Sequence, residues 1–191
     1  MNQSISPARR WYFAIGVSVL AFALAGCLKF PLGDPETATV DPALAGSWFK
    51  RADDGAVTIW HAQVYDARTY LVMQYQAKPD GNAGWERGSM TICKMWLTTV
   101  KGKSFGCLQV LSEQSDKPYV AFKYERSGES ITIQGISGDY VDKAGVANAA
   151  DFVALVDAHV DDAAMYLDAD KYEKTGDADK ETVDAILKAF H

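Results

Sequence analysis

The sequence predicts a mainly β domain, an antiparallel meander that closes into a barrel or half-barrel and is followed by two α-helices. From residue 46 to residue 134, apolar and polar side chains alternate in short runs separated by turn residues. This pattern is typical of half-buried strands joined by hairpins. Near residue 148 the apolar period becomes helical. Such a meander must close or pack as a sandwich, because exposed sheet edges pair with other chains.

The strands are expected in seven runs. They are residues 46–51, 57–62, 71–76, 91–100, 104–111, 119–124 and 130–134. Trp48, Trp60 and Trp96 fall within these runs and are expected in the core. Trp85 stands beside a glycine-rich loop, where it is either a core residue or an exposed contact residue.

Two helices are expected after the strands. The first, capped by Asn148 or Asp151, places an apolar stripe on one face; that stripe is Phe152, Leu155, Val156 and His159. The second follows Gly176, and its stripe is Val183, Ile186, Leu187 and Phe190. The acid-rich run 168–181 between them lacks the Gly and Glu positions of an EF-hand. It is therefore interpreted as a solvated linker whose Asp177 or Asp179 caps the second helix.

The N-terminus carries the features of an export signal. Arg9 and Arg10 precede the charge-free run 11–26, which is shorter than the roughly 20 residues of a membrane-spanning helix. The run ends in Leu24-Ala-Gly-Cys27, which resembles the lipobox of bacterial lipoproteins. This resemblance implies that residues 1–26 are removed and that Cys27 carries a diacylglyceryl thioether and an N-acyl chain. Since Leu28 rather than Asp follows the cysteine, it also implies an outer-membrane protein facing the periplasm.

The remaining chain divides into a tether and one domain. Residues 27–45 contain Pro31, Pro35 and Pro42 with little periodicity, and predict a lipidated tether of roughly 60 Å at about 3.3 Å per residue. Alternatively, Phe30 and Leu32 rest against the bilayer or the domain. Residues 46–191 are expected to form a single domain.

The charge of the chain is negative and unevenly placed. The formal net charge is −6, and residues 139–191 hold 13 acidic against 5 basic side chains. This distribution argues against nucleic acid as a partner and against electrostatic adhesion to anionic lipid. Membrane attachment would depend on the lipid anchor.

Cys93 and Cys107 are the cysteines that remain after Cys27. Export would place them in an oxidising compartment. If the chain turns at position 100, the two cysteines lie opposite each other on neighbouring strands. We therefore expect a disulfide, the alternative being two buried thiols.

No residue pattern predicts catalysis or a metal site. His61, His159 and His191 are the histidines, and none has metal-ligand spacing with a neighbour. No nucleophile elbow or phosphate loop is present. The sequence thus predicts a protein that is not an enzyme and has no cofactor other than the covalent lipid on Cys27.

Gly46-Ser47-Trp48 opens the first strand and resembles the Gly-x-Trp motif of lipocalins. The resemblance spans roughly residues 46–160 in architecture and implies a lipocalin-like barrel whose tryptophan plugs the closed end. In this interpretation the barrel binds a small apolar or lipid ligand, lined by Leu71, Met73, Tyr75 and Met95. The alternative is a solid barrel that docks to another envelope protein.

Overall fold

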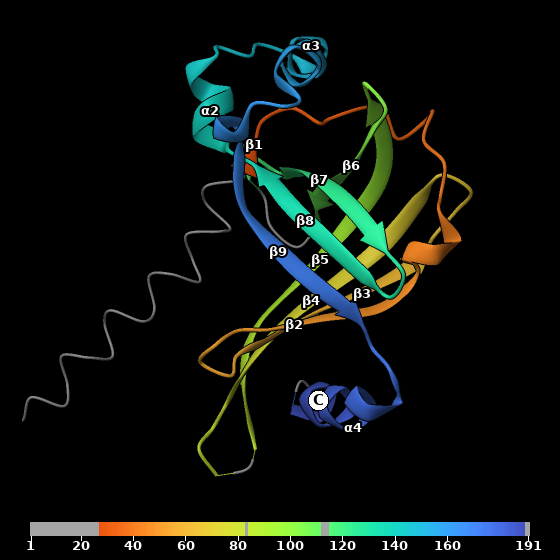
Figure 1. Ribbon diagram of the computed structural model, residues 1–191, viewed down its shortest axis with the longest axis vertical. Helices are drawn as coiled ribbons and strands as arrows, with labels where there is room; N and C mark the ends of the chain where they lie inside the picture. Colours follow the sequence, from red (N-terminus) through yellow and green to blue (C-terminus); the bar gives the residue numbers. More distant parts are fainter. Residues whose placement is uncertain (1–26, 83, 112–114, 190–191) are drawn as a thin grey trace, which may run out of the picture.

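The computed structural model describes residues 27–82, 84–111 and 115–189, and within them eight antiparallel strands close into a barrel (Figure 1). The strands are β2 (Gly46–Arg51), β3 (Val57–Val64), β4 (Thr69–Pro79), β5 (Trp85–Val100), β6 (Lys103–Val110), β7 (Tyr119–Ser127), β8 (Ser130–Ile136) and β9 (Tyr166–Lys174). Strands β2 to β8 form a meander, and β9 pairs with both β8 and β2 to close it. The seven predicted strands are confirmed, and the sheet is a closed barrel. The predicted signal, residues 1–26, lies outside the described residues.

Strand β9 corrects the prediction of a solvated linker. Its acidic side chains find partners on both neighbouring strands: Asp170 forms an ion pair with Lys50 of β2, and Glu173 accepts a hydrogen bond from Ser130 Oγ of β8 over 2.6 Å. Tyr172 points into the barrel and is 6% exposed. Because the backbone pairs on both edges, β9 needs few apolar side chains to hold its place.

The β5–β6 hairpin shows that the predicted disulfide is wrong. Lys101 (φ 47°) and Gly102 (φ 73°) form a two-residue turn with both φ values positive, which pairs Val100 with Lys103. This turn lies between residues 101 and 102 rather than at residue 100, so Cys93 faces Val110 and Cys107 faces Trp96. The two thiols point to opposite faces of the sheet, since strand side chains alternate, and they are not bonded.

Residues 27–44, here called the N-terminal strap, pack on the barrel, so the structure shows the alternative in which Leu32 rests against the domain rather than an extended tether. The strap begins with β1 (Cys27–Leu28), which pairs with β7, and ends with a short 3-10 helix, η2 (Pro42–Leu44). Four of its apolar side chains are buried; they are Leu28, Leu32, Ala38 and Leu44. Proline content and missing periodicity do not separate a free linker from a segment that follows a folded surface.

Three α-helices cover the outside of the barrel within the described part of the chain. They are α2 (Gly138–Lys143), α3 (Ala149–His159) and α4 (Asp177–Ala189). Asn148 caps α3 as predicted, because its side chain accepts a hydrogen bond from the Asp151 amide over 2.9 Å. Helix α2 was not predicted; Ser137 caps it. No described helix is long and apolar enough to span a membrane.

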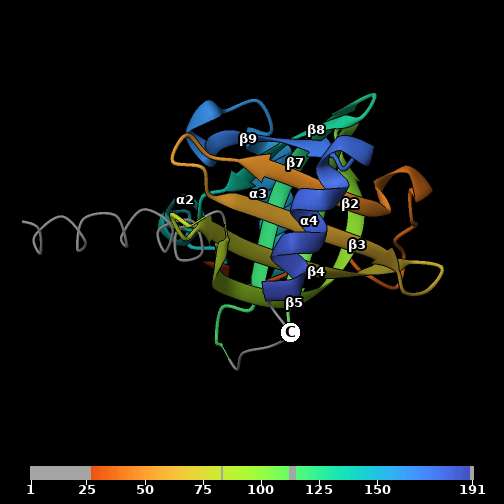
Figure 2. The ribbon, with the colours of Figure 1, turned by 90° about the horizontal axis from the view of Figure 1, so that it is seen from below.

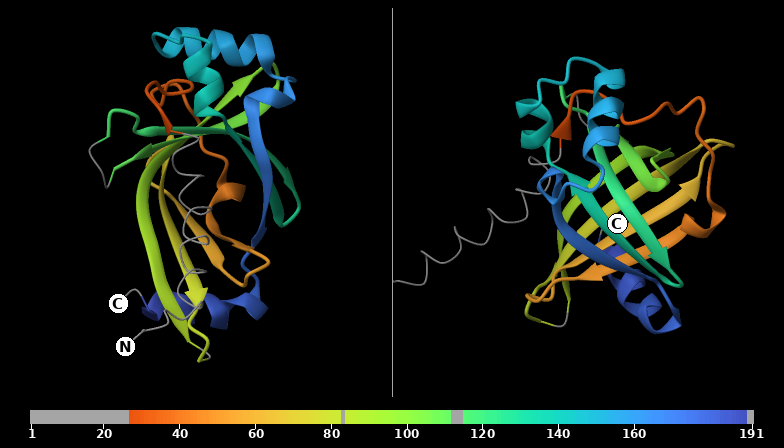
Figure 3. Two further views of the ribbon diagram at one scale, coloured as in Figure 1. Left: turned by 90° about the vertical axis from the view of Figure 1, so that its left-hand side faces the viewer. Right: turned by 45° about the horizontal axis from the view of Figure 1, so that its top comes forward.

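The apolar core has one part inside the barrel and two parts outside it. The outer face of β5, β6 and β7 packs against the N-terminal strap, α2 and α3 around Trp96, Phe105 and Phe152. Figure 2 shows α4 lying across the outer face of β2 to β5, where Ile186 and Val57 share one apolar cluster. Helices α2 and α3 lie at one end of the molecule and α4 at the other (Figure 3).

Candidate functional site

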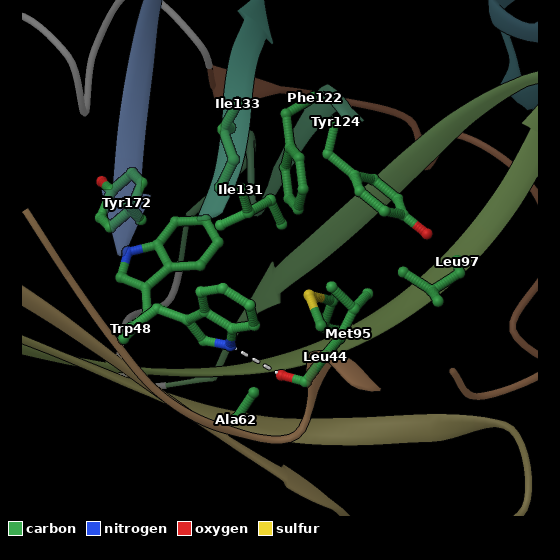
Figure 4. Close-up of a pocket in the computed structure, with 11 residues that line it drawn as sticks. Leu44, Trp48, Ala62, Met95, Leu97, Phe122, Tyr124, Ile131, Ile133 and Tyr172 are labelled. Atoms are coloured by element: carbon green, nitrogen blue, oxygen red, sulfur yellow. Dashed lines mark hydrogen bonds between the residues drawn. The ribbon is translucent and has the colours of Figure 1, made fainter. Parts of the chain in front are cut away.

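The barrel interior is filled by aromatic and aliphatic side chains from six strands and η2 (Figure 4). A cavity of about 20 Å³ remains among them. Its lining residues are Leu44, Trp48, Trp60, Ala62, Met95, Leu97, Phe122, Tyr124, Ile131, Ile133 and Tyr172. A volume of this size holds roughly one water, whereas small-molecule sites measure about 300 to 1,000 Å³.

Trp48 and Trp60 occupy the centre of this interior and differ in their hydrogen bonding. Trp48 Nε1 donates to the carbonyl oxygen of Leu44 over 2.9 Å, which ties the first barrel strand to η2. Trp60 packs against Phe122 and Tyr172 with ring centroids 5.6 and 5.4 Å apart. Its buried Nε1 has no hydrogen-bond partner. An apolar interior therefore contains one indole N–H that an acceptor would satisfy.

The predicted ligand-binding residues do not come together. Met95 is 4% exposed and lines the cavity, as predicted. Leu71, Met73 and Tyr75 lie on the outer face of β4, and the alternate residues, Tyr70 and Val72, point inward. Both faces of this strand are apolar because α4 covers part of the outside. Alternation alone therefore does not identify the inner face.

The outward residues of β4 join those of β5 in an apolar surface, here called the β4–β5 stripe. It consists of Leu71, Met73, Tyr75, Met90 and Ile92. Met73 is the register partner of Ile92, and Tyr75 is the partner of Met90. Met90 is 43% exposed, and Leu111, which is 52% exposed, donates its amide to the Ile92 carbonyl over 2.8 Å. The stripe thus begins at Tyr75, beside α4, and continues along β4 and β5 to the exposed Met90 and Leu111.

The two thiols are buried in separate parts of the core. Burial raises the pKa of both Cys93 and Cys107 to about 12. Cys107 also accepts a hydrogen bond from the Leu32 amide at 3.4 Å, which opposes the effect of burial only in part. Neutral, enclosed thiols are poor nucleophiles, so neither geometry nor acidity favours redox chemistry.

His61 and His159 lie on different elements, β3 and α3, and do not contact each other. His61 Nδ1 lies 2.9 Å from Ser47 Oγ on the outer face of β2 and β3, a pairing that the sequence did not predict. The described residues give His61 no carboxylate partner, and a Ser–His contact alone is not a catalytic triad. His159 lies 3.8 Å from Asp162. His191 falls outside the described residues.

No group of three or more His, Cys, Asp or Glu that could hold a metal ion occurs among the described residues. Comparisons with protein-family models, with curated proteins and with solved structures found no match. The chain forms a closed antiparallel barrel, with a short 3-10 helix before its first barrel strand and a buried Trp48 near the start of that strand. This architecture is consistent with a lipocalin-like barrel.

Proposed function

We propose that this chain is a membrane-anchored envelope lipoprotein that acts as a non-enzymatic docking module with a solid barrel. The observation that carries the proposal is the interior cavity of about 20 Å³, which is an order of magnitude below what a ligand carrier needs. Of the two functions that the sequence suggests, docking requires a rigid exterior and no cavity. The barrel fits that requirement.

The anchor in this proposal is the acylated Cys27. The charge-free run 11–26, the small residues before Cys27 and the two arginines support it. Two or three acyl chains hold a protein on a membrane almost permanently, whereas one chain does so only marginally. Leu28 after the cysteine favours the outer membrane, with the barrel in the periplasm.

The docking surface in this proposal is the β4–β5 stripe. Tyr75 at one end of the stripe packs against the α4 cluster, whereas Met90 is 43% exposed and Leu71, Met73 and Ile92 are half-buried. Met73 and Met90 suit a contact surface, because methionine side chains adapt to the shape of a partner. The partner that the stripe fits is an envelope protein with an apolar face of its own.

Site-specific photo-crosslinking in intact membranes tests the docking proposal. A photoreactive residue at Met90 should give one adduct of defined mass, and the same residue at exposed Glu125 of β7 should give none. Met73→Asp, checked for an unchanged melting temperature, should abolish the Met90 adduct because it places a charge in the contact. Equal adducts at both positions, or an adduct that survives Met73→Asp, would contradict the proposal.

A small-ligand function is the second candidate, and one observation favours it. The unpaired Nε1–H of Trp60 faces an apolar space, and a ligand with a single acceptor atom would satisfy it. Binding would require the Trp60–Phe122–Tyr172 cluster to open. A lipid retained by the purified protein, and lost in Trp60→Phe, would favour this candidate over docking.

A further inference from the structure

Cys27 lies directly against the barrel, with no free chain between them. It is the first residue of β1 and pairs in register with Val120 of β7, while Leu28 pairs with Tyr119 and is 2% exposed. Helix α2 also contacts β1. A free linker of 18 residues would let the domain move through roughly 60 Å. Here the attachment point is part of the sheet.

The rest of the N-terminal strap is held at two further places. Leu32 is fully buried, donates its amide to Cys107 Sγ at 3.4 Å and accepts a hydrogen bond from Trp96 Nε1 at 2.9 Å. Farther along, Tyr70 Oη donates to the Asp41 carbonyl over 2.8 Å. Since these contacts lie on different strands, the strap does not come away from the barrel as a free linker would.

The surface around Cys27 carries both signs of charge. Lys29 and Lys143 are exposed, as is Asp139 on α2, and Lys117 forms an ion pair with Asp142 over 2.6 Å. Residues 138–162, which contain α2 and α3, hold six Asp against one Lys, so this end is acidic and has no attraction of its own for anionic lipid. The orientation of the protein on the membrane is therefore set by the position of the lipid attachment point and not by attraction to anionic lipid.

We propose that the protein stands on the membrane in one fixed orientation, with the end that bears β1 and α2 against the phospholipid headgroups. The inference rests on the proposed acylation of Cys27. Helix α4 and the β4–β5 loop lie at the opposite end of the molecule and point away from the membrane (Figures 1 and 3). The β4–β5 stripe then lies on the side wall, where a partner in the same membrane can reach it.

Quenching of single fluorophores tests this orientation. The acylated protein is placed in phosphatidylcholine vesicles whose headgroups carry a nitroxide quencher. A fluorophore is attached at Lys143→Cys on α2 or at Lys188→Cys on α4, both exposed positions. Because Cys93 and Cys107 are buried, the introduced thiol is labelled selectively. Quenching should be at least several-fold stronger at position 143 than at position 188, and replacing a fifth of the lipid with phosphatidylglycerol should not change the ratio.

A matched control inserts 20 Gly/Ser residues between Cys27 and Leu28. This linker spans roughly 25 Å on average and leaves the barrel unchanged. The quenching ratio should then fall towards one. Equal quenching at both positions in the parent protein, while its mass shows the acyl chains and it floats with the vesicles, overturns the fixed orientation alone. A parent protein without acyl chains overturns the proposed anchor.

Discussion

Trp96 donates its indole N–H to the carbonyl oxygen of Leu32 over 2.9 Å, which joins the N-terminal strap to the outer face of β5. Both residues are buried, at 1% and 0% exposure. Trp96→Phe would leave the Leu32 carbonyl buried without this partner. We expect a loss of about 1–3 kcal/mol in the free energy of unfolding, measured in urea, and faster proteolysis within residues 27–44. An unchanged proteolysis rate would show that the strap is held without this bond.

The two interior tryptophans provide a matched pair of substitutions. Trp48→Phe removes a donor that is bonded to Leu44, whereas Trp60→Phe removes a donor that has no partner. The loss of ring volume is the same in both. We expect Trp48→Phe to destabilise the protein by about 1–3 kcal/mol more than Trp60→Phe does. Equal losses in urea unfolding would mean that Trp60 Nε1 is bonded in solution.

Gly106 leaves room for a ring inside the barrel. A Cβ at this position would lie 2.6 Å from Cε2 of Phe122. Gly106→Ala should therefore cost about 1–3 kcal/mol through overpacking, measured as a lowered denaturant midpoint. Gly176→Ala is the control, because its added methyl group meets nothing within 4 Å. A neutral Gly106→Ala would show that the interior yields easily and is not solid.

The unlinked thiols predict a labelling pattern. In the Cys27→Ser chain, prepared without reductant, maleimide should label two thiols after unfolding and none in the native protein, since Cys93 is 3% exposed and Cys107 is fully buried. Mass spectrometry counts the labels. An unfolded chain that takes no label would establish a disulfide and contradict the β5–β6 register.

The same thiols predict that stability falls at alkaline pH. Burial raises the pKa of Cys93 and Cys107 to about 12 in the folded protein, whereas the pKa of an unfolded cysteine is about 8.5. Between these values the folded state holds more protons, so the free energy of unfolding decreases as pH rises. The slope is at most about 1.4 kcal/mol per pH unit for each thiol. Burial likewise raises the pKa of Tyr70 to about 12, which adds to the loss above pH 10.

Urea unfolding at pH 8 and pH 10 measures this slope. Cys107→Ala is expected to reduce the slope, whatever its own effect on stability, because one of the titrating groups is gone. A slope that Cys107→Ala leaves unchanged would assign the alkaline loss to other groups.

The sequence predicts the barrel well because in most of its strands apolar side chains that face the core alternate with side chains on the opposite face. The prediction fails where a segment shows no alternation, or where both faces of a strand are apolar. Strand β9 has one buried side chain, Tyr172, among charged neighbours, so its pattern indicates a solvated segment. Strand β4 is apolar on both faces, so Leu71, Met73 and Tyr75 were assigned to the wrong one. The strap has neither period, because Leu28 and Leu32 pack against a surface built by residues far along the chain.

The register of the β5–β6 hairpin explains why the predicted disulfide is absent. Placing the turn between Lys101 and Gly102, rather than at Val100, moves the partner of Cys93 from residue 107 to residue 110. An odd shift moves a side chain to the other face of the sheet. A Lys-Gly pair suits a two-residue turn less obviously than Asn-Gly does, although Lys101 adopts a φ of 47°. The predicted disulfide therefore depended on the exact position of the hairpin turn, which composition does not specify.

The mass of the intact protein, released from its own membranes in mild detergent and measured under native conditions, tests the central claim most directly. We expect a chain that begins at Cys27 and carries covalent diacylglyceryl and acyl groups, with no further lipid or small molecule retained. A chain without acyl groups would contradict the anchor. An additional mass that is retained natively and lost on denaturation would contradict the solid barrel.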